Sequence, residues 1–503
     1  MRKFTLLLLF ALTCAYAGAA EHIVVLDTLD EVDFRVKTDY VLTGTLRSNT
    51  MIYVGEGAVF TLRNATIQGE DVEKCRWAGI EIIGNATMIL EGNNYVRGYN
   101  GYWPGIFVRR TATLRIKGDG YLYAASNRYG AGIGGGASWT EKDSNMNPLT
   151  SYDLDAGNIL IEGGTIKAVG ADRSPGIGAP PNSYHGWIKI TSGVNRVEVT
   201  KGPNAEYFIG GTGVISDVGH EVTIGGKNYG EDGNSGPLYQ RTYTYIPWTG
   251  NLSQLTDDAE VKDGSTITGN LTKPYKITIP DGAHIKLENA SINPAGTTWD
   301  NTPFGGLNCE GDATIEITGE ETNIIYGIGK GYPAIHVPAG KTLHLIGDGV
   351  LMAYGALWGA GIGGGSAVDC GNIHIGGALN IYAKGGCDYA AGIGGGYKKS
   401  NGTITIDNTV RRVKVETCES ASCTVGAGYG SGALQQGKIY VGGRTYNGCI
   451  DDNPFIYLGT NQQGIEEVTP SDSPSKGEKI LRDGQLLIVV GEKTYDARGA
   501  EVR

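Results

Sequence analysis

Carboxylate pairs are the residues of this chain whose types and spacing could support acid–base chemistry. "TDD" ends at Asp258, and "DDNPF" begins at Asp451. Glycoside-cleaving enzymes use two carboxylic acids at a defined separation, and neither pair has a second carboxylate cluster nearby in the sequence. "DVGH", which ends at His220, has a counterpart without histidine in the second half of the chain. We therefore expect no catalytic residue.

Three histidines are the other candidates for site chemistry. His336, His344 and His374 fall on alternate positions of segments that read as strands. Histidine is a common zinc ligand, but a metal site needs a geometry that spacing cannot supply, and outward polar positions on a sheet explain the same pattern. We expect no metal site and no cofactor. A divalent cation could bridge the chain to a ligand, but no sequence motif supports such a site.

Aromatic residues are the part of the sequence that most indicates ligand binding. Tyr and Trp gather in loop-like segments rich in Gly, Asn and Pro, where rings can stack on the apolar face of a sugar or anchor a protein interface. The same rings can simply pack over strand edges, and the sequence leaves both interpretations open. The candidate ligand-binding residues are Tyr99, Tyr102, Trp103, Tyr129, Trp139, Tyr184, Trp187, Trp299 and Trp358.

Glycine-rich runs recur along the chain, as "YGAGIGGG" (129–136), "WGAGIGGG" (358–365) and "YAAGIGGG" (389–396). A phosphate-binding glycine loop requires a helix directly after it, and loop-like or strand-like sequence follows each of these runs. We interpret them as structural corners in which glycine adopts positive φ. The corner glycines are Gly132, Gly134, Gly361, Gly363, Gly392 and Gly394.

The segments that position these residues occur in two similar copies, which indicates an internal duplication. Gly134 and Gly363 occupy equivalent places, which gives an offset of 363 − 134 = 229 residues. Within each copy, short alternating strands are separated by glycine turns every ~20 to 30 residues, which is typical of solenoid repeats. The sequence predicts an all-β fold, a right-handed parallel β-helix of two tandem modules. The boundaries are a secretory leader at 1–20, module one at 21–235, a connection at 236–262, module two at 263–460, a linker at 461–479 and a C-terminal β segment at 480–503.

Net charge and composition limit the classes of molecule that this chain is expected to bind. The 503 residues carry a formal charge of −11, and removal of a leader with Arg2 and Lys3 would make it −11 − 2 = −13. An acidic chain repels nucleic acid and polyanionic glycans and attracts basic proteins. No stretch is long enough and apolar enough for a membrane span. Of eight cysteines, Cys14 lies in the leader, which leaves seven, an odd number, for an oxidising compartment.

The alternation of "GNILIEGG" strands with "GAGIGGG" corners resembles glycine-rich right-handed β-helix surface proteins of gut and rumen bacteria, some of them grouped as carbohydrate-binding. The resemblance implies a surface-exposed binding or adhesion role. The tail, "ILRDGQLLIVVGEKTYDARGAEVR", resembles the sorting domains of type IX secretion cargo. That resemblance implies export to the outer surface of a Gram-negative bacterium.

The expected function is therefore a secreted, surface-displayed, non-catalytic protein that captures an extracellular polysaccharide or a secreted host protein through loops on the β-helix. The alternative is a polysaccharide lyase or glycoside hydrolase on the same scaffold.

Overall fold

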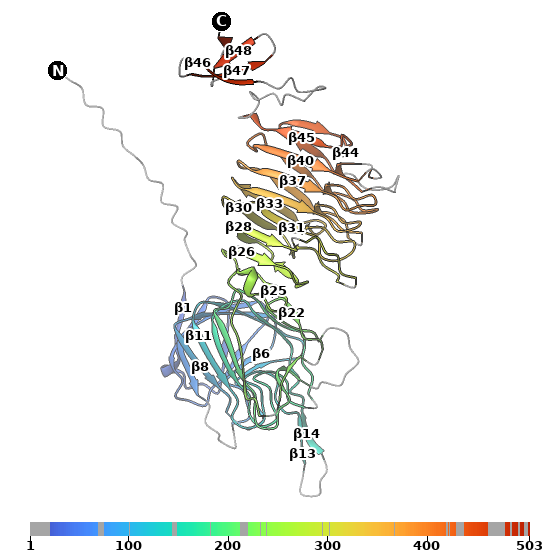
Figure 1. The fold of residues 1–503 in the computed structure, drawn as a ribbon. Coiled ribbons are helices and arrows are strands. Elements are labelled where there is room, and N and C mark those ends of the chain that lie inside the picture. Colours follow the sequence, from blue (N-terminus) through green and yellow to red (C-terminus); the bar gives the residue numbers. More distant parts are fainter. Residues whose placement is uncertain are drawn as a thin grey trace, which may run out of the picture.

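The computed structural model describes residues 21–460 except 69–74, 100, 143–147, 182, 212–219, 232, 238, 294, 301, 367, 419–420, 422 and 429–436, together with four strands of the tail. The leader and the linker lie outside the described residues. The described chain is all-β, a parallel β-solenoid of about 11 turns over residues 53–426. Figure 1 shows the two modules end to end, the first in blue to green and the second in yellow to orange.

Each module is built from one short-strand sheet and one double-width sheet. In a typical turn of the first module, the chain runs through one strand of the narrow sheet and then through two strands of the wide sheet, with a glycine between those two. The narrow sheet contains β2 (Asp33–Val36), β4 (Met51–Val54), β6 (Ile80–Ile82), β9 (Ile106–Val108), β12 (Ile133–Gly134), β17 (Ile177–Gly178), β20 (Tyr207–Gly210) and β23 (Gly233–Ser235).

The wide sheet of the first module contains β1 (His22–Val25), β3 (Tyr40–Thr45), β5 (Ala58–Gln68), β7 (Ala86–Glu91), β8 (Asn93–Arg97), β10 (Thr113–Gly118), β11 (Tyr121–Ala125), β15 (Asn158–Ile161), β16 (Thr165–Val169), β18 (Ile188–Ile190), β19 (Arg196–Thr200), β21 (Val222–Ile224), β22 (Lys227–Asn228) and β24 (Thr242–Tyr245). Outside both sheets lie the hairpin of β13 (Trp139–Lys142) and β14 (Pro148–Tyr152) and the 3₁₀ turn η1 (Leu26–Thr28).

The second module repeats this plan after a second 3₁₀ turn, η2 (Leu252–Gln254). Its narrow sheet contains β25 (Ala259–Glu260), β27 (Ile277–Ile279), β29 (Leu307–Cys309), β32 (Ile335–His336), β35 (Ile362–Gly363), β38 (Ile393–Gly394), β41 (Val425–Gly426) and β44 (Cys449–Ile450).

Its wide sheet contains β26 (Thr266–Leu271), β28 (Ala283–Ile292), β30 (Ala313–Thr318), β31 (Asn323–Tyr326), β33 (Thr342–Gly347), β34 (Val350–Tyr354), β36 (Asn372–Ile375), β37 (Asn380–Lys384), β39 (Ile404–Ile406), β40 (Arg412–Glu416), β42 (Ile439–Val441), β43 (Arg444–Tyr446) and β45 (Phe455–Leu458). The tail forms an antiparallel sheet of β46 (Glu478–Arg482), β47 (Gln485–Val490), β48 (Lys493–Asp496) and β49 (Glu501–Val502).

Strand alternation builds one continuous core inside each module. In β10, Leu114 and Ile116 are fully buried, whereas Arg115 and Lys117 face outward. The same inward position recurs from turn to turn, so that Ile133 pairs in register with Ile177. Each such buried side chain contributes about 1.5–3 kcal/mol, and stacking the turns removes the apolar face of every turn from water.

The glycine corners are required by close backbone approach. Gly134 and Gly363 have φ of +130° and +133°, and a Cβ at either would lie 2.1 Å from a carbonyl oxygen of the next turn. Gly394 repeats this geometry. Gly132, Gly361 and Gly392 differ from the expectation, because their φ is not positive; there a Cβ would instead collide with neighbouring backbone or side-chain atoms.

Each module ends on a turn that reverses the chain. Two-residue hairpins at Gly225–Gly226 and Gly442–Gly443, with φ positive at both positions, return the chain as β22 and β43, as type I′ turns do. Antiparallel strands then cover the last parallel turn, β23 and β24 in the first module and β44 and β45 in the second. These caps pair the exposed backbone edge of each coil.

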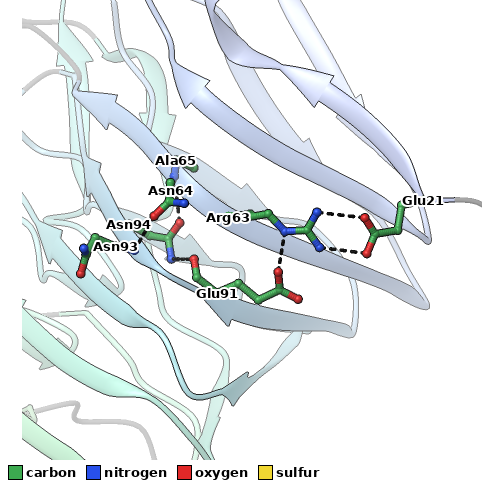
Figure 2. Close-up of polar contacts among 7 residues, drawn as sticks. All are labelled: Glu21, Arg63, Asn64, Ala65, Glu91, Asn93 and Asn94. Carbon is green, nitrogen blue, oxygen red and sulfur yellow. Dashed lines mark hydrogen bonds and ion pairs between the residues drawn. The ribbon is translucent and has the colours of Figure 1, made fainter.

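A buried asparagine ties the turns together at the same place in both modules. Asn94 is fully buried; its Oδ1 accepts the N–H of Ala65 at 2.9 Å, and its Nδ2 donates to the carbonyls of Glu91 at 3.1 Å and Tyr121 at 3.2 Å. Figure 2 shows the contacts with Ala65 and Glu91. Asn323 makes the corresponding three hydrogen bonds in the second module. Because every polar atom is satisfied, this asparagine can stay inside an apolar core.

The two modules meet through a buried carboxyl group. Glu260 is 1 % exposed, and its Oε1 accepts hydrogen bonds from the N–H (2.8 Å) and the hydroxyl (2.9 Å) of Ser192. Burial raises the pKa of Glu260. The predicted connection at 236–262 carries β24, η2 and β25; it therefore supplies the cap of one module and the first turn of the next.

Candidate functional site

The strongest candidate site is a nine-residue surface on the wide sheet of module two, which we call the tyrosine grid. It is formed by the three outward positions of each of β34, β37 and β40, which lie in register. All nine side chains are partly exposed, and much of the grid lines a shallow groove of about 550 Å³. The grid consists of Val350, Met352, Tyr354, Asn380, Tyr382, Lys384, Arg412, Lys414 and Glu416.

Aromatic rings form a platform on this surface. The rings of Tyr326, on β31, and Tyr354 stack with centroids 4.3 Å apart and planes 11° apart. Tyr382 meets Tyr354 edge-on at 5.5 Å, and Met352 is aligned with Tyr382 on the neighbouring strand. Consecutive turns of a solenoid lie ~4.8 Å apart. The three rings therefore form one aromatic cluster that extends over three consecutive turns.

Charge surrounds this platform. Tyr382 donates its hydroxyl to Glu416 at 2.6 Å, and Lys414 lies 2.7 Å from the same carboxylate. These hydrogen bonds, from Lys414 first, lower the pKa of Glu416, whereas burial and the bond to Glu416 raise the pKa of Tyr382. The positively charged residues of the grid are Lys384, Arg412 and Lys414, and its one negatively charged residue is Glu416. The grid thus carries 3 − 1 = 2 positive charges on an otherwise acidic chain.

A second candidate is a pocket of about 460 Å³ in module one, which we call the arginine pocket. Buried Glu81 on β6 accepts hydrogen bonds from two nitrogens of Arg109 at 2.5 and 2.6 Å. Asp155 lies 3.5 Å from Arg110 and accepts the N–H of Tyr184 at 2.7 Å. Burial raises the pKa of both carboxyl groups. A carboxyl group whose pKa is raised by burial can serve as a general acid.

Several of the predicted aromatic residues are buried or packed against the core. Tyr99 is 2 % exposed, and its ring lies 5.4 Å from that of Trp77. Trp103 is 9 % exposed and meets Phe107 edge-on at the arginine pocket. Trp299 is half-buried against the core of module two. The side chain of Trp139 lies outside the described residues.

The other predicted aromatics remain partly exposed but lie apart from the tyrosine grid. Tyr102 and Tyr129 stack on each other at 5.2 Å. Tyr184 lies 4.8 Å from the guanidinium of Arg110, and Trp187 lines a shallow groove of module one. Trp358 lies between Lys330 and Tyr397 at a corner of module two.

Sequence reasoning missed the tyrosine grid because it searched loops. Tyr326, Tyr354 and Tyr382 stand at outward positions of "NIIY", "VLMAY" and "NIYAK". The alternation that placed Ile and Ala in the core also placed these rings outside. Aligning successive turns by that alternation would have brought the three tyrosines together.

The aspartates weighed and set aside in the sequence lie in different surroundings. Asp257 pairs with Lys227, and Asp258 accepts the N–H of Lys276 at 2.8 Å, both near the module junction. Asp451 is exposed, and Asp217 lies outside the described residues.

The histidines divide into two environments. His336 is largely buried, and burial together with nearby Lys276 lowers its pKa to about 4. His344 and His374 contact each other on the wide sheet. Within the described part of the chain, no group of three or more His, Cys, Asp and Glu residues has an arrangement that could hold a metal ion.

The cysteines of module two include one disulfide, Cys423–Cys449. The thiols of Cys387 and Cys418, on neighbouring turns, lie 2.7 Å apart. Burial raises the pKa of Cys309 and Cys370 to about 12, which removes both as nucleophiles at neutral pH.

Comparison of the chain with protein-family models, curated proteins and solved structures found no match. Across the described residues, no helix is long and apolar enough to cross a membrane.

Proposed function

We propose that this chain is an exported, non-catalytic binding protein whose tyrosine grid holds an acidic polysaccharide. The observation that carries the proposal is the combination of stacked tyrosine rings with three cationic side chains on one partly exposed surface. The apolar face of a sugar packs on an aromatic ring, and Lys and Arg donate charge-assisted hydrogen bonds to its carboxylate.

The positive charge of the tyrosine grid favours an acidic glycan over a neutral one. The net charge of −11 disfavours a polyanion at long range. At contact distance, however, Lys384, Arg412 and Lys414 outnumber Glu416. A polymer with one carboxylate per sugar suits this surface better than a neutral polymer or a basic protein does. Display on the outer surface through type IX secretion belongs to the same proposal, and the leader-like residues 1–20 and the resemblance of the tail to sorting domains support it.

The test is affinity electrophoresis of the full chain in gels that contain polygalacturonate or a neutral β-glucan. We expect retardation by polygalacturonate that weakens as salt rises, because screening reduces the charge contribution. Equal retardation by both polymers would contradict the acidic-glycan assignment. Retardation by neither, combined with capture of one secreted host protein, would replace the glycan by a protein ligand.

A cleaving enzyme is the second candidate, and the arginine pocket is what favours it. Glu81 and Asp155 are carboxyl groups with raised pKa values in a pocket that two arginines and Trp103 also line. Release of reducing ends or of unsaturated uronates from the same polymers would identify this activity. Its loss in Asp155→Asn, with binding retained, would locate it in module one.

A further inference from the structure

A histidine pair lies on the wide sheet of module two, on different strands from the tyrosine grid. His344 on β33 and His374 on β36 are in register on neighbouring turns. Their Nδ1 atoms lie 3.1 Å apart, and the rings meet at 81° with centroids 5.2 Å apart. Two nitrogens bound ~2.0–2.1 Å from one ion are separated by roughly 2.9–3.4 Å in square-planar and tetrahedral geometries. The observed separation falls within that range.

Asp407 sets the tautomer of one of these rings. Its Oδ2 lies 2.9 Å from Nε2 of His374. A carboxylate can only accept a hydrogen bond, so Nε2 carries the proton and donates it. Neutral His374 then has its lone pair on Nδ1, the atom that faces His344. A carboxylate behind a histidine in this way orients the ring and makes the opposite nitrogen a better metal ligand.

The local sequence leaves room for this arrangement. A Cβ on Gly376 would lie 2.9 Å from Oδ2 of Asp407, so a larger residue there would obstruct the carboxylate. The same outward column holds Thr314 before His344 and Thr405 after His374. Neither is bulky, and the side chain of His374 is 36 % exposed. The pair is therefore open to solvent.

We propose that His344 and His374 bind one divalent transition-metal ion of the Ni²⁺, Cu²⁺ or Zn²⁺ class through their Nδ1 atoms, with Asp407 hydrogen-bonded behind His374. The described residues contribute no third His, Cys, Asp or Glu with suitable geometry. The remaining coordination positions belong to water or to a donor group of an external ligand. Imidazole nitrogens suit these ions and not Mg²⁺ or Ca²⁺. This inference does not depend on the proposed glycan site.

The test is calorimetric titration of the chelator-treated full chain with Ni²⁺, and then with Zn²⁺. We expect one ion per chain, and at least a 10-fold loss of affinity in His344→Asn and in His374→Asn. Asp407→Asn is expected to lose affinity about 10- to 100-fold without removing a ligand. His284→Asn is the matched control, because His284 lies in the same outward column beyond Thr314.

Three results would overturn the proposal: no saturable binding by the wild-type chain, binding that is unchanged in both histidine variants, or an equal loss in His284→Asn. Unchanged far-ultraviolet circular dichroism and unfolding temperature in each variant exclude loss of the fold as the cause. Ca²⁺ serves as the ion that should not compete.

Discussion

The two modules share one backbone plan and differ in what their outer face carries. Both have the buried asparagine, the glycine corners and the reversed final turn. At the middle outward position of three consecutive turns, module one has Tyr123, Lys167 and Glu198. Module two has Met352, Tyr382 and Lys414 at those positions.

The corresponding surfaces also differ in net charge. In module one, Lys167 and Arg196 both pair with Glu198, at 2.8 and 2.9 Å, which leaves a net charge of 2 − 1 = +1 against +2 on the tyrosine grid. Elsewhere in that module, Arg63 joins Glu21 and Glu91 and lowers the pKa of Glu21 (Figure 2), whereas Glu288 takes the equivalent place in module two. Inward residues therefore maintain the solenoid in both modules, while outward residues differ between them.

Substitution of the corner glycines should cause the largest loss of stability in both modules. Gly134→Ala and Gly363→Ala each place a Cβ about 2 Å from a backbone oxygen at positive φ, and we expect a loss of about 3–4 kcal/mol in unfolding free energy. Gly57→Ala is the control, because its φ is also positive but no atom lies within 4 Å; it should lose only about 1 kcal/mol. Chemical denaturation measures all three, and equal losses would show that packing between turns is not the cause.

The next largest difference between the modules should come from reduction of the disulfide, which is expected to lower the unfolding temperature of module two only. The disulfide Cys423–Cys449 closes a loop of 26 residues in the last turns of module two, and its loss should cost about 3 kcal/mol. Module one contains a single described cysteine, the buried Cys75. Scanning calorimetry with and without reductant should therefore shift the module-two transition alone. A shift of module one would contradict this assignment.

The asparagines offer a matched pair of variants. Asn94→Ala and Asn323→Ala each leave backbone groups in the core without their partner, and we expect about 2–3 kcal/mol of destabilisation from each. Asn93→Ala, which changes an exposed neighbour, should be close to neutral. If only one of the two buried positions were sensitive, the modules would not share this device.

The smallest effect concerns pH at the tyrosine grid. Hydrogen bonds from Lys414 and Tyr382 depress the pKa of Glu416 below 4.5 in the folded chain. The resulting stabilisation is present above the unfolded pKa and is lost as the pH falls through the folded pKa. The side chain is partly exposed, so we expect no more than about 0.5 kcal/mol. Comparison of unfolding at pH 7 and pH 3 should show a smaller pH dependence in Glu416→Gln than in the wild-type chain.

The fold could be predicted from the sequence because its determinants are local and repeated. Alternation such as that around Leu114 and Ile116 identifies inward positions, and each glycine run identifies a corner. The reversed final turns were not predicted, because "VTIGGKNYG" and "IYVGGRTYNG" mark hairpins only when pairing is known. The candidate site was not predicted either. Its residues come from strands about 30 residues apart, and the register between those strands is set by three-dimensional stacking.

The most direct test of the glycan site compares one partly exposed tyrosine from the wide sheet of each module, Tyr382 of the tyrosine grid and Tyr123 of module one. Isothermal titration of the full chain with a galacturonate oligosaccharide is made for the wild type, Tyr382→Ala and Tyr123→Ala. Removing the ring of Tyr382 should weaken binding at least 10-fold, because stacking and the orientation of Lys414 are lost together. Tyr123→Ala should bind as the wild type does. Equal affinity of all three chains, or a greater loss from Tyr123→Ala, would contradict a binding site on module two.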